Sequence, residues 1–396
     1  MTNILFITWD GPQTSYMEGL FMPIFDQIQK QSTYRFHVIQ FTWGTNQRIA
    51  VTQKKAEDLN IIFMAKRIYR KPNSLVGSLF TVFKNGSFLE KYIKKNTIDI
   101  IMPRSTMPSI MVNQLKKATF KIIFDADGLP IEERIDFSGL KKNSFIYKFL
   151  KKEEYATLLK SKTVITRSKK AIQFHLKTLG IEASNKFFVV VNGRDIDSLK
   201  PNDIQNKRTR EELNLKNDTK VFLYSGSLGP QYGWETMIKI FKRYLQINHN
   251  SVFLILTANL EFAKKRIPPT LVNHIILKSV PFEEIPKYLS IGDVAFAIRE
   301  PKQSMQGVAP IKLGEYLLMG IPTIASSGIG DTEAILLGNP NCLLVTHETN
   351  DTVEKALHFI NKSSDFNRDE IREFGITNFS IEKSVLSYLN ALNHCS

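Results

Sequence analysis

Short apolar runs rich in β-branched residues recur along the chain, and a segment long enough to form a helix follows most of them. Apolar runs of this length are typical of strands that are buried on both faces of a parallel sheet. The first half of the chain predicts strands at residues 4–8, 36–42, 61–64, 98–102, 121–124, 163–166 and 188–191. The second half predicts strands at residues 221–224, 252–257, 274–277, 294–298, 323–325 and 343–345.

Two successive series of strands and helices indicate an α/β protein with two doubly wound, parallel-sheet domains. The length of 396 residues agrees, because it exceeds what one small core usually holds. The boundary is expected in the polar stretch 192–201, and a short helix is expected at 209–215. We assign residues 1–190 to a first domain and residues 191–375 to a second. Residues 376–396 are expected to form a helix that packs back on the first domain.

Composition and charge narrow the class of protein. A hydrophobic content of 43% excludes a disordered chain, and two cysteines exclude a disulfide scaffold and suit a reducing, cytoplasmic compartment. The chain has a net charge of +15, and the whole excess lies in residues 1–200, which carry 32 basic and 17 acidic side chains. Residues 201–396 carry 21 of each and are neutral. The first half is therefore expected to meet an anionic partner: a nucleic acid, a membrane surface or a phosphorylated substrate.

The sequence predicts neither a signal peptide nor a membrane-spanning segment. The apolar run 4–7 lacks a basic flank and is broken by polar residues. No run approaches the roughly 18 apolar residues that a bilayer-spanning helix needs. Contact with a membrane would therefore be peripheral.

Loops at the carboxyl ends of parallel strands are the expected ligand sites. The loop 10–15 follows the first strand, and Gly11 permits a close backbone approach while Thr14 or Ser15 can cap the next helix. The loop 224–234 contains three glycines between a strand and a helix, which predicts a cradle for a phosphate or diphosphate. A plain strand-to-helix turn remains the alternative for both loops.

The segment 299–326 carries the most informative pattern. Lys312 and Glu315 are three residues apart on one face of a predicted helix, near its N-terminus. A lysine at this point can neutralise a diphosphate, and a carboxylate can accept two hydroxyls of a ribose. Gly320 and Pro322 end the helix and lead into the next strand. As a bare spacing, however, Lys-x-x-Glu is usually a surface ion pair.

The sequence from Pro310 to Ala325 resembles the nucleotide-binding signature of family-4 retaining glycosyltransferases. The resemblance covers nearly all of residues 190–340. It implies the GT-B fold, in which two Rossmann-like domains face each other across a cleft. It also implies transfer of a sugar from a nucleotide diphospho-sugar with retention at the anomeric carbon, and it implies no required cofactor.

Several site residues follow from the resemblance by position. Glu315 would hold the nucleotide ribose and Lys312 the diphosphate, with the backbone amides of Gly226 and Ser227 on the same phosphates. Backbone near Val280 would contact the base.

Two positions depart from the pattern of this family. Gly307 stands where the family often has a first glutamate, so Glu300 is the candidate for the carboxylate that contacts the sugar. The basic pair of the glycine loop is replaced by Ser227 and Tyr232, and Arg299 is the candidate for the missing positive charge.

The expected catalytic position in the first domain is Asp125 or Asp127, immediately after the strand 121–124. Many members of the family have a catalytic histidine near this point, but none occurs between His37 and His175. Either aspartate could accept or orient the proton of an acceptor hydroxyl. A divalent-metal motif and a structural turn are the alternatives, and we expect no metal because GT-B enzymes typically need none.

The basic first half is expected to hold the acceptor, with Gly11 and Arg104 among its contacts. In the segment 140–152, Phe145, Phe149 and Leu150 alternate with lysines, as on a helix that lies on an anionic membrane. A solvated lysine-rich face is the alternative, and no RNA-binding sequence or zinc spacing supports nucleic acid as the partner. Further basic clusters are Lys66, Arg67, Arg70 and Lys71; Lys91, Lys94 and Lys95; and Lys116 and Lys117.

Together these observations predict a glycosyltransferase that acts on a glycan or lipid-linked acceptor in bacterial capsule or O-antigen assembly. The protein would be cytoplasmic and peripheral to the membrane. Two alternatives stay open: a nucleotide-sugar epimerase of the same fold, and a non-catalytic protein that binds anions or nucleic acid.

Overall fold

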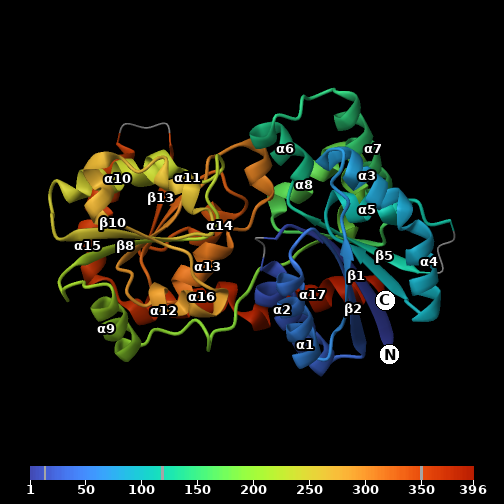
Figure 1. The fold of residues 1–396 in the computed structure, drawn as a ribbon, viewed down its shortest axis with the longest axis horizontal. Helices are drawn as coiled ribbons and strands as arrows, with labels where there is room; N and C mark the ends of the chain where they lie inside the picture. The colour runs from blue at the N-terminus through green and yellow to red at the C-terminus, as the bar shows by residue number, and fades with distance from the viewer. Residues whose placement is uncertain (13–14, 117–119, 348–350) are drawn as a thin grey trace. The chain divides into compact units, whose positions relative to one another are not determined.

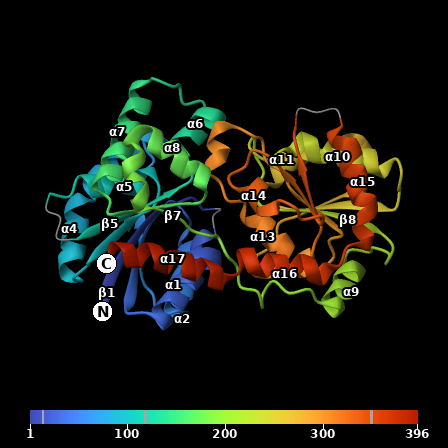
Figure 2. The ribbon, with the colours of Figure 1, turned by 180° about the vertical axis from the view of Figure 1, so that it is seen from behind.

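The computed structural model describes residues 1–12, 15–116, 120–347 and 351–396, which divide into two compact units (Figure 1). Each unit contains one parallel sheet with helices on both of its faces (Figure 2). Unit 1 consists of Met1–Val191, Gln306–Val308 and Ser384–Ser396, and unit 2 consists of Asn192–Met305 and Ala309–Lys383.

The sheet of unit 1 has seven parallel strands in the order β3-β2-β1-β4-β5-β6-β7. The chain builds outward from β1 to β3 and then returns to the other side of β1, so the strand order reverses between β1 and β4. In open parallel sheets, ligands bind at the carboxyl ends of the strands beside such a reversal. The strands are β1 (Thr2–Asp10), β2 (Tyr34–Thr42), β3 (Ile62–Arg67), β4 (Ile100–Pro103), β5 (Lys121–Asp127), β6 (Thr163–Thr166) and β7 (Phe187–Val189).

The helices of unit 1 bury an aromatic core against this sheet, in which the rings of Phe25 and Phe36 stack at 4.1 Å. From Ser384 onward the last helix of the chain belongs to this unit, where Asn393 accepts a hydrogen bond from Tyr34 at 3.0 Å. The elements are η1 (Met17–Phe21), α1 (Met22–Gln31), α2 (Asn46–Asp58), α3 (Ser74–Lys84), α4 (Gly86–Lys95), α5 (Thr106–Asn113), α6 (Pro130–Ser138), α7 (Phe145–Lys160), α8 (Lys169–Leu179), η2 (Ile181–Lys186) and α17 (Ile381–Cys395).

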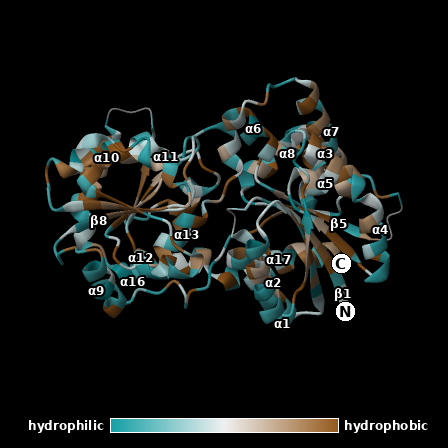
Figure 3. Cartoon of the chain, in the orientation of Figure 1, coloured by the Kyte–Doolittle hydropathy of each residue, from teal (hydrophilic) through white to brown (hydrophobic). Residues whose placement is uncertain are grey.

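The sheet of unit 2 has six parallel strands in the order β10-β9-β8-β11-β12-β13, and its order reverses between β8 and β11. Its interior is apolar, as Figure 3 shows by hydropathy, and includes the buried rings of Phe222, Phe253 and Phe296. The strands are β8 (Lys220–Ser225), β9 (Ser251–Leu256), β10 (Ile275–Lys278), β11 (Val294–Ala297), β12 (Thr323–Ser326) and β13 (Cys342–Val345).

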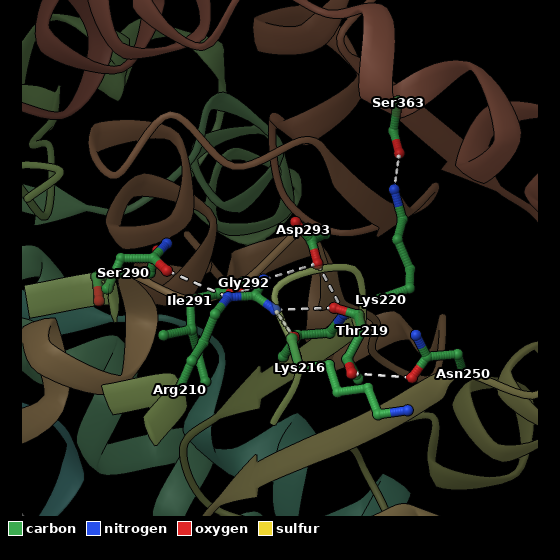
Figure 4. A network of polar contacts seen from close by, with 12 residues as sticks. Arg210, Lys216, Thr219, Lys220, Asn250, Ser290, Ile291, Gly292, Asp293 and Ser363 are labelled. Atoms are coloured by element: carbon green, nitrogen blue, oxygen red, sulfur yellow. Dashed lines mark hydrogen bonds and ion pairs between the residues drawn. The ribbon is translucent and has the colours of Figure 1, made fainter. Parts of the chain in front are cut away.

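A polar network at the amino ends of β8 and β11 anchors helix α9 (Figure 4). Arg210 forms an ion pair with Asp293 at 3.3 Å and donates to the carbonyl of Thr219 at 2.9 Å. The helices are α9 (Asp203–Glu212), α10 (Trp234–Leu245), α11 (Leu260–Lys264), α12 (Ile285–Leu289), α13 (Ile311–Leu318), α14 (Thr332–Leu336), α15 (Thr352–Lys362) and α16 (Arg368–Phe379). Short 3-10 helices are η3 (Pro269–His274), η4 (Phe282–Glu284), η5 (Gln303–Gly307) and η6 (Ser363–Asp365).

Every strand predicted from the sequence is present, and the parallel two-sheet class is confirmed. Two local predictions are wrong. The helix expected at 209–215 is α9, which begins at Asp203 because Asn202 caps its first turn, and which ends at Glu212. Ser15 is not the N-cap of the first helix, because Tyr16 takes that position and makes no side-chain capping hydrogen bond; Thr14 lies outside the described residues. None of the described helices combines the length and apolar character that crossing a bilayer would take.

Candidate active site

The ammonium of Lys312 lies among aromatic rings at the start of α13. Pro310 precedes this helix as its N-cap, and Lys312 is buried in its first turn. Its Nζ donates a hydrogen bond to the Tyr224 hydroxyl at 2.7 Å and lies 4.1 Å from the centroid of that ring. The ring of Tyr232, from the glycine loop, lies 4.5 Å from the same nitrogen. The two tyrosines therefore fix the position of the cation.

Arg299 provides a second positive charge beside Lys312. It follows β11, and its guanidinium carbon lies 4.7 Å from the Tyr232 ring centroid. Burial, together with the charge of Arg299, lowers the pKa of Lys312 well below its ordinary value, while Glu315 opposes this shift. Two positive groups that lie against the same tyrosine ring would be stabilised by a polyanion such as a diphosphate.

Gly226 lies close to Lys312, but its backbone amide is not free to contact a phosphate as the sequence predicted. Its φ of +133° is a conformation that L-residues rarely adopt, and an added Cβ would lie 3.2 Å from Lys312 Nζ. Its amide donates to the carbonyl of Leu256 at 2.9 Å, so the fold already uses the amide that we expected to contact a phosphate. Ser227 is exposed next to it, and its carbonyl accepts from the Tyr224 hydroxyl. The glycine makes room for the lysine.

Glu315 forms a buried ion pair with Arg194, which the sequence did not predict. Arg194 Nε lies 2.9 Å from Glu315 Oε1, and the two side chains are 8% and 10% exposed. The Arg194 guanidinium also lies 5.6 Å from the ring of Phe282, two residues after the half-buried Val280. Arg194 therefore connects the predicted ribose carboxylate to the loop that we expect to contact the base.

His347 joins the loops at the carboxyl ends of three strands. Its Nε2 lies 2.8 Å from the Ser326 hydroxyl, and its Nδ1 lies 3.1 Å from the hydroxyl of Thr236 in the first turn of α10. Ser326 in turn accepts from the amide of Arg299 at 2.9 Å. Burial lowers the pKa of His347, and the carboxylate of Glu300, 3.7 Å away, opposes this effect. This network holds the backbone that carries Arg299.

Steric crowding explains why residue 307 is a glycine rather than a glutamate. An added Cβ at Gly307 would lie 2.8 Å from the amide nitrogen of Leu129 and 2.9 Å from the carbonyl carbon of Gly128, all within unit 1. No side chain fits there without a shift of the backbone. In unit 2, the side chain of Glu300 is 34% exposed, so its carboxylate can reach a ligand.

In unit 1, Asp127 is held by two buried arginines. Arg104 Nη2 lies 2.7 Å from Asp127 Oδ2, and Arg167 Nε lies 3.9 Å from Asp127 Oδ1. The side chain of Asp127 is 34% exposed, whereas those of Arg104 and Arg167 are 11% and 3% exposed. The carboxylate thus has a fixed direction and remains open to a ligand.

The backbone at this point adopts rare conformations. Asp127 has φ of +64° and Ser105, which follows Arg104, has φ of +66°. The pairing of β5 with β6 shifts register between Asp125 and Asp127. Strained backbone of this kind persists where the surroundings enforce it and is common at functional sites.

Asp125 differs from Asp127 in its surroundings. Its side chain is fully buried, accepts from the amide of Asp127 at 3.0 Å and forms an ion pair with Arg167 at 2.8 Å. Because no ligand can reach a carboxylate in this position, Asp125 supports the loop rather than contacting an acceptor. Of the two predicted aspartates, Asp127 is the one available for chemistry.

Asp10 and Gly11 lie at the end of β1, beside the reversal of strand order. Burial raises the pKa of Asp10, whose carboxylate accepts from Thr8 at 2.9 Å and from Gln40 at 3.0 Å. Gly11 packs under Trp43, and an added Cβ would lie 3.0 Å from that ring. Among the described residues no group of three or more histidine, cysteine, aspartate or glutamate side chains is arranged to hold a metal ion.

The segment 140–152 does not present the continuous basic and apolar face that its pattern suggested. Leu150 is buried in the core, and Phe149 packs against it. Lys151 is bound to Glu132 at 3.1 Å and to Glu154. Phe145 remains fully open on this helix, at 86% exposure. In the third basic cluster, Lys117 lies outside the described residues.

The sequence did not predict three polar residues of these sites: Arg194, His347 and Arg167. Arg167 directly follows β6, His347 lies two residues after β13, and Arg194 lies five residues after β7. Arg194 lies in the polar stretch 192–201, which predicts a domain boundary rather than a ligand site. Their partners are 121, 21 and 42 residues away in the chain, so no local spacing reveals them.

Comparison with known proteins agrees with this geometry. Residues 205–374 match the family described as Glycosyl transferases group 1. The Anabaena protein Alr3699/HepE, solved in complex with UDP-glucose, is 14% identical with a TM-score of 0.71 over 99% of this chain and 100% of its own. Sucrose-phosphate synthase from Thermosynechococcus elongatus is 15% identical with a TM-score of 0.72, over 99% of this chain and 98% of its own.

WaaG, a glycosyltransferase involved in lipopolysaccharide biosynthesis, has a TM-score of 0.67 at 13% identity, over 98% of both chains. No curated protein matches this chain significantly. The fold is GT-B, as the two parallel-sheet units and these solved structures show. The chain is a glycosyltransferase, and its residues 205–374 form a group 1 domain.

Proposed function

We propose that this glycosyltransferase is a retaining enzyme of family 4 that moves a sugar from a nucleotide diphospho-sugar to a glycan or lipid-linked acceptor. The observation that carries the proposal is the cation pair Lys312 and Arg299, which share the ring of Tyr232, with Glu315 one helical turn after Lys312 on α13. The two cations can bind a diphosphate, and the carboxylate can bind the hydroxyls of a ribose. The solved relatives with UDP or UDP-glucose bound support a nucleotide sugar as donor.

The two cations would act most strongly when the bond from the sugar to the diphosphate breaks. At that point negative charge grows on the departing phosphate oxygen, and preorganised positive groups stabilise it more than they stabilise the bound donor. The anomeric carbon becomes oxocarbenium-like and is attacked by an acceptor hydroxyl. Glu300, with its exposed carboxylate, is proposed to bind hydroxyls of the transferred sugar.

Unit 1 is proposed to hold the acceptor. Its carboxylate Asp127, fixed by Arg104, would accept a hydrogen bond from the reacting hydroxyl and orient it. The excess of basic residues in this half suits an acceptor carried by a lipid diphosphate at the cytoplasmic face of an anionic membrane. Such acceptors serve the assembly of bacterial surface polysaccharides, which is the role we propose.

A panel of UDP-, GDP- and dTDP-sugars tests the enzymatic proposal. With the correct donor, the purified protein is expected to release the nucleoside diphosphate slowly in the absence of acceptor and to gain thermal stability. Recovery of an isomerised donor would identify an epimerase instead. No hydrolysis and no thermal shift with any of these donors would contradict the proposal.

Lys312 is expected to make nucleotide binding depend on pH. Its pKa is lowered in the free enzyme, and a bound diphosphate would raise it, so binding takes up a proton between the two pKa values. Affinity is therefore expected to fall as pH rises through that interval. Calorimetry in two buffers of different ionisation enthalpy, repeated at a series of pH values above the phosphate's second pKa near 6, measures this uptake.

The matched variant for this experiment is Lys312→Met, which keeps the length of the side chain and removes its charge. We expect it to bind the nucleoside diphosphate more weakly and without proton uptake. If the variant took up as many protons as the wild type, another group would be responsible and the assignment of Lys312 to the diphosphate would be wrong.

A further inference from the structure

Helix α3 of unit 1 presents an apolar face to solvent. Val76, Phe80 and Phe83 are spaced at i, i+4 and i+7, which places them on one side of the helix, and they are 46%, 51% and 57% exposed. Tyr69, which precedes the helix and is 45% exposed, extends this face because its ring meets that of Phe80 edge-on at 5.0 Å. We call these four residues the α3 surface.

The opposite side of α3 fixes this orientation. Gly77 packs so closely on the preceding segment that an added Cβ would lie 2.3 Å from the carbonyl oxygen of Tyr69. The hydroxyl of the buried Thr81 accepts from the amide of Tyr69 at 2.9 Å. Val82, beside it, is fully buried in the core of unit 1. The helix cannot rotate to bury its phenylalanines without breaking these contacts.

The stretch that carries the α3 surface is basic throughout. Residues 59–89 contain five lysines and arginines and no aspartate or glutamate. Lys84 Nζ donates to the Tyr69 hydroxyl at 3.0 Å and lies 5.5 Å from the Phe80 ring centroid, so a positive charge borders the apolar face directly. Arg70 and Lys71 are exposed three to four residues before the helix, and the Arg70 guanidinium carbon lies 4.6 Å from the centroid of the Trp43 ring.

We propose that the α3 surface docks unit 1 onto an anionic lipid bilayer, with Phe80 and Phe83 in the interface and Lys84, Arg70 and Lys71 at the lipid phosphates. Aromatic side chains favour the interfacial region, and long basic side chains reach from it to the headgroups. Each basic residue near an anionic leaflet strengthens binding by roughly fivefold. Docking would give the enzyme access to a membrane-borne acceptor, and this purpose rests on the proposed function.

A bilayer fits this surface better than a second protein. An apolar face bordered by cations, in a stretch without any acidic residue, complements a surface of uniform negative charge. A second copy of the chain would bring the same positive charges against these and would be repelled. The segment 140–152, predicted from its sequence to lie on the membrane, has acidic partners on Lys151 instead.

Vesicle sedimentation of the full chain tests the proposal, with phosphatidylcholine vesicles that do or do not contain 30% phosphatidylglycerol. We expect the wild type to bind the anionic vesicles and to dissociate at high salt, because screening weakens the basic contacts. The double variant Phe80→Ser/Phe83→Ser is expected to bind at least about tenfold more weakly, since the buried aromatic area is lost. Lys84→Glu is expected to show a similar loss on anionic vesicles.

Phe145→Ser is the matched control, because it removes an even more exposed phenylalanine from the segment 140–152, which the sequence predicts to lie on the membrane. We expect it to bind like the wild type. All variants replace exposed side chains, so circular dichroism and the melting temperature are expected to stay unchanged. If Phe145→Ser lost binding and the α3 variants did not, or if binding ignored lipid charge and salt, the proposal would be overturned.

Two further outcomes separate this inference from the proposed function. A wild-type chain that hydrolyses a nucleotide sugar but ignores anionic vesicles would overturn the docking surface and leave the transferase proposal intact. If size-exclusion chromatography with light scattering showed a dimer that the α3 variants convert to monomer, a second copy would be the occupant and the bilayer would be excluded.

Discussion

Glu315→Gln is expected to weaken binding of the nucleoside diphosphate about tenfold or more, because a charged acceptor for ribose hydroxyls becomes a neutral one. The substitution keeps the size of the side chain and leaves an oxygen for Arg194, which lies 2.9 Å from the carboxylate in the wild type. Glu315→Ala would be less informative. It strands a buried guanidinium, which costs about 3–5 kcal/mol of unfolding free energy and mixes folding with binding.

The ribose role itself is measured with a modified ligand. Calorimetry compares the nucleoside diphosphate with its 2′,3′-dideoxy analogue on the wild type and on Glu315→Gln. The wild type is expected to prefer the natural nucleotide strongly, and the variant is expected to lose most of this preference. An unchanged preference would show that Glu315 does not bind the ribose, whatever happens to the overall affinity.

Arg194→Met extends this experiment to the residue that positions the carboxylate. We expect a smaller loss of nucleotide affinity than for Glu315→Gln, together with a reduced preference for the natural ribose. Lysine at this position is expected to restore part of the preference because it can still pair with Glu315. If Arg194→Met lowered the melting temperature but kept the full preference, Arg194 would serve the fold alone.

The second large effect is expected at Asp127. Asp127→Asn is predicted to reduce turnover about 10²- to 10⁴-fold, the usual contribution of a side chain that guides a proton in the transition state. Donor binding is expected to change little, because Asp127 belongs to unit 1 and the donor residues belong to unit 2. Steady-state kinetics with separate measurement of donor affinity check this division.

Asp125→Asn is the matched control for that experiment. This aspartate is fully buried against Arg167, so its neutralisation is expected to lower the free energy of unfolding by about 3–5 kcal/mol. Chemical denaturation would record the loss. Equal losses of turnover and donor affinity in Asp127→Asn, or a purely thermal effect, would mean that Asp127 also serves the structure.

Both sheets were predictable because their strands are continuous apolar runs. A strand such as Ser251–Leu256 is buried on both faces, and burial of this kind leaves a mark in the sequence that does not depend on distant partners. The pair Lys312 and Glu315 was predictable for a similar reason. Both lie on one turn of α13, so their spacing in the chain sets their spacing in space.

The remaining features depend on contacts between distant parts of the chain. Nothing near Gly226 indicates that its amide bonds Leu256, and nothing near Asp125 indicates that Arg167 makes it inaccessible. In the sequence, the lysines of the segment 140–152 cannot be told apart. In the structure, Lys151 differs from the others because it pairs with Glu132 of α6. In each case the decisive partner lies on another element.

By itself, then, the sequence determined the α/β class, the two series of strands and the local pair on α13, because local periodicity and helical spacing encode them. Only the tertiary structure decided which aspartate is open, which charge holds Glu315 and which face of α3 meets solvent. These properties follow from burial and from pairing across the fold, where the energy of a charge or an apolar ring depends on neighbours that the chain brings in from far away.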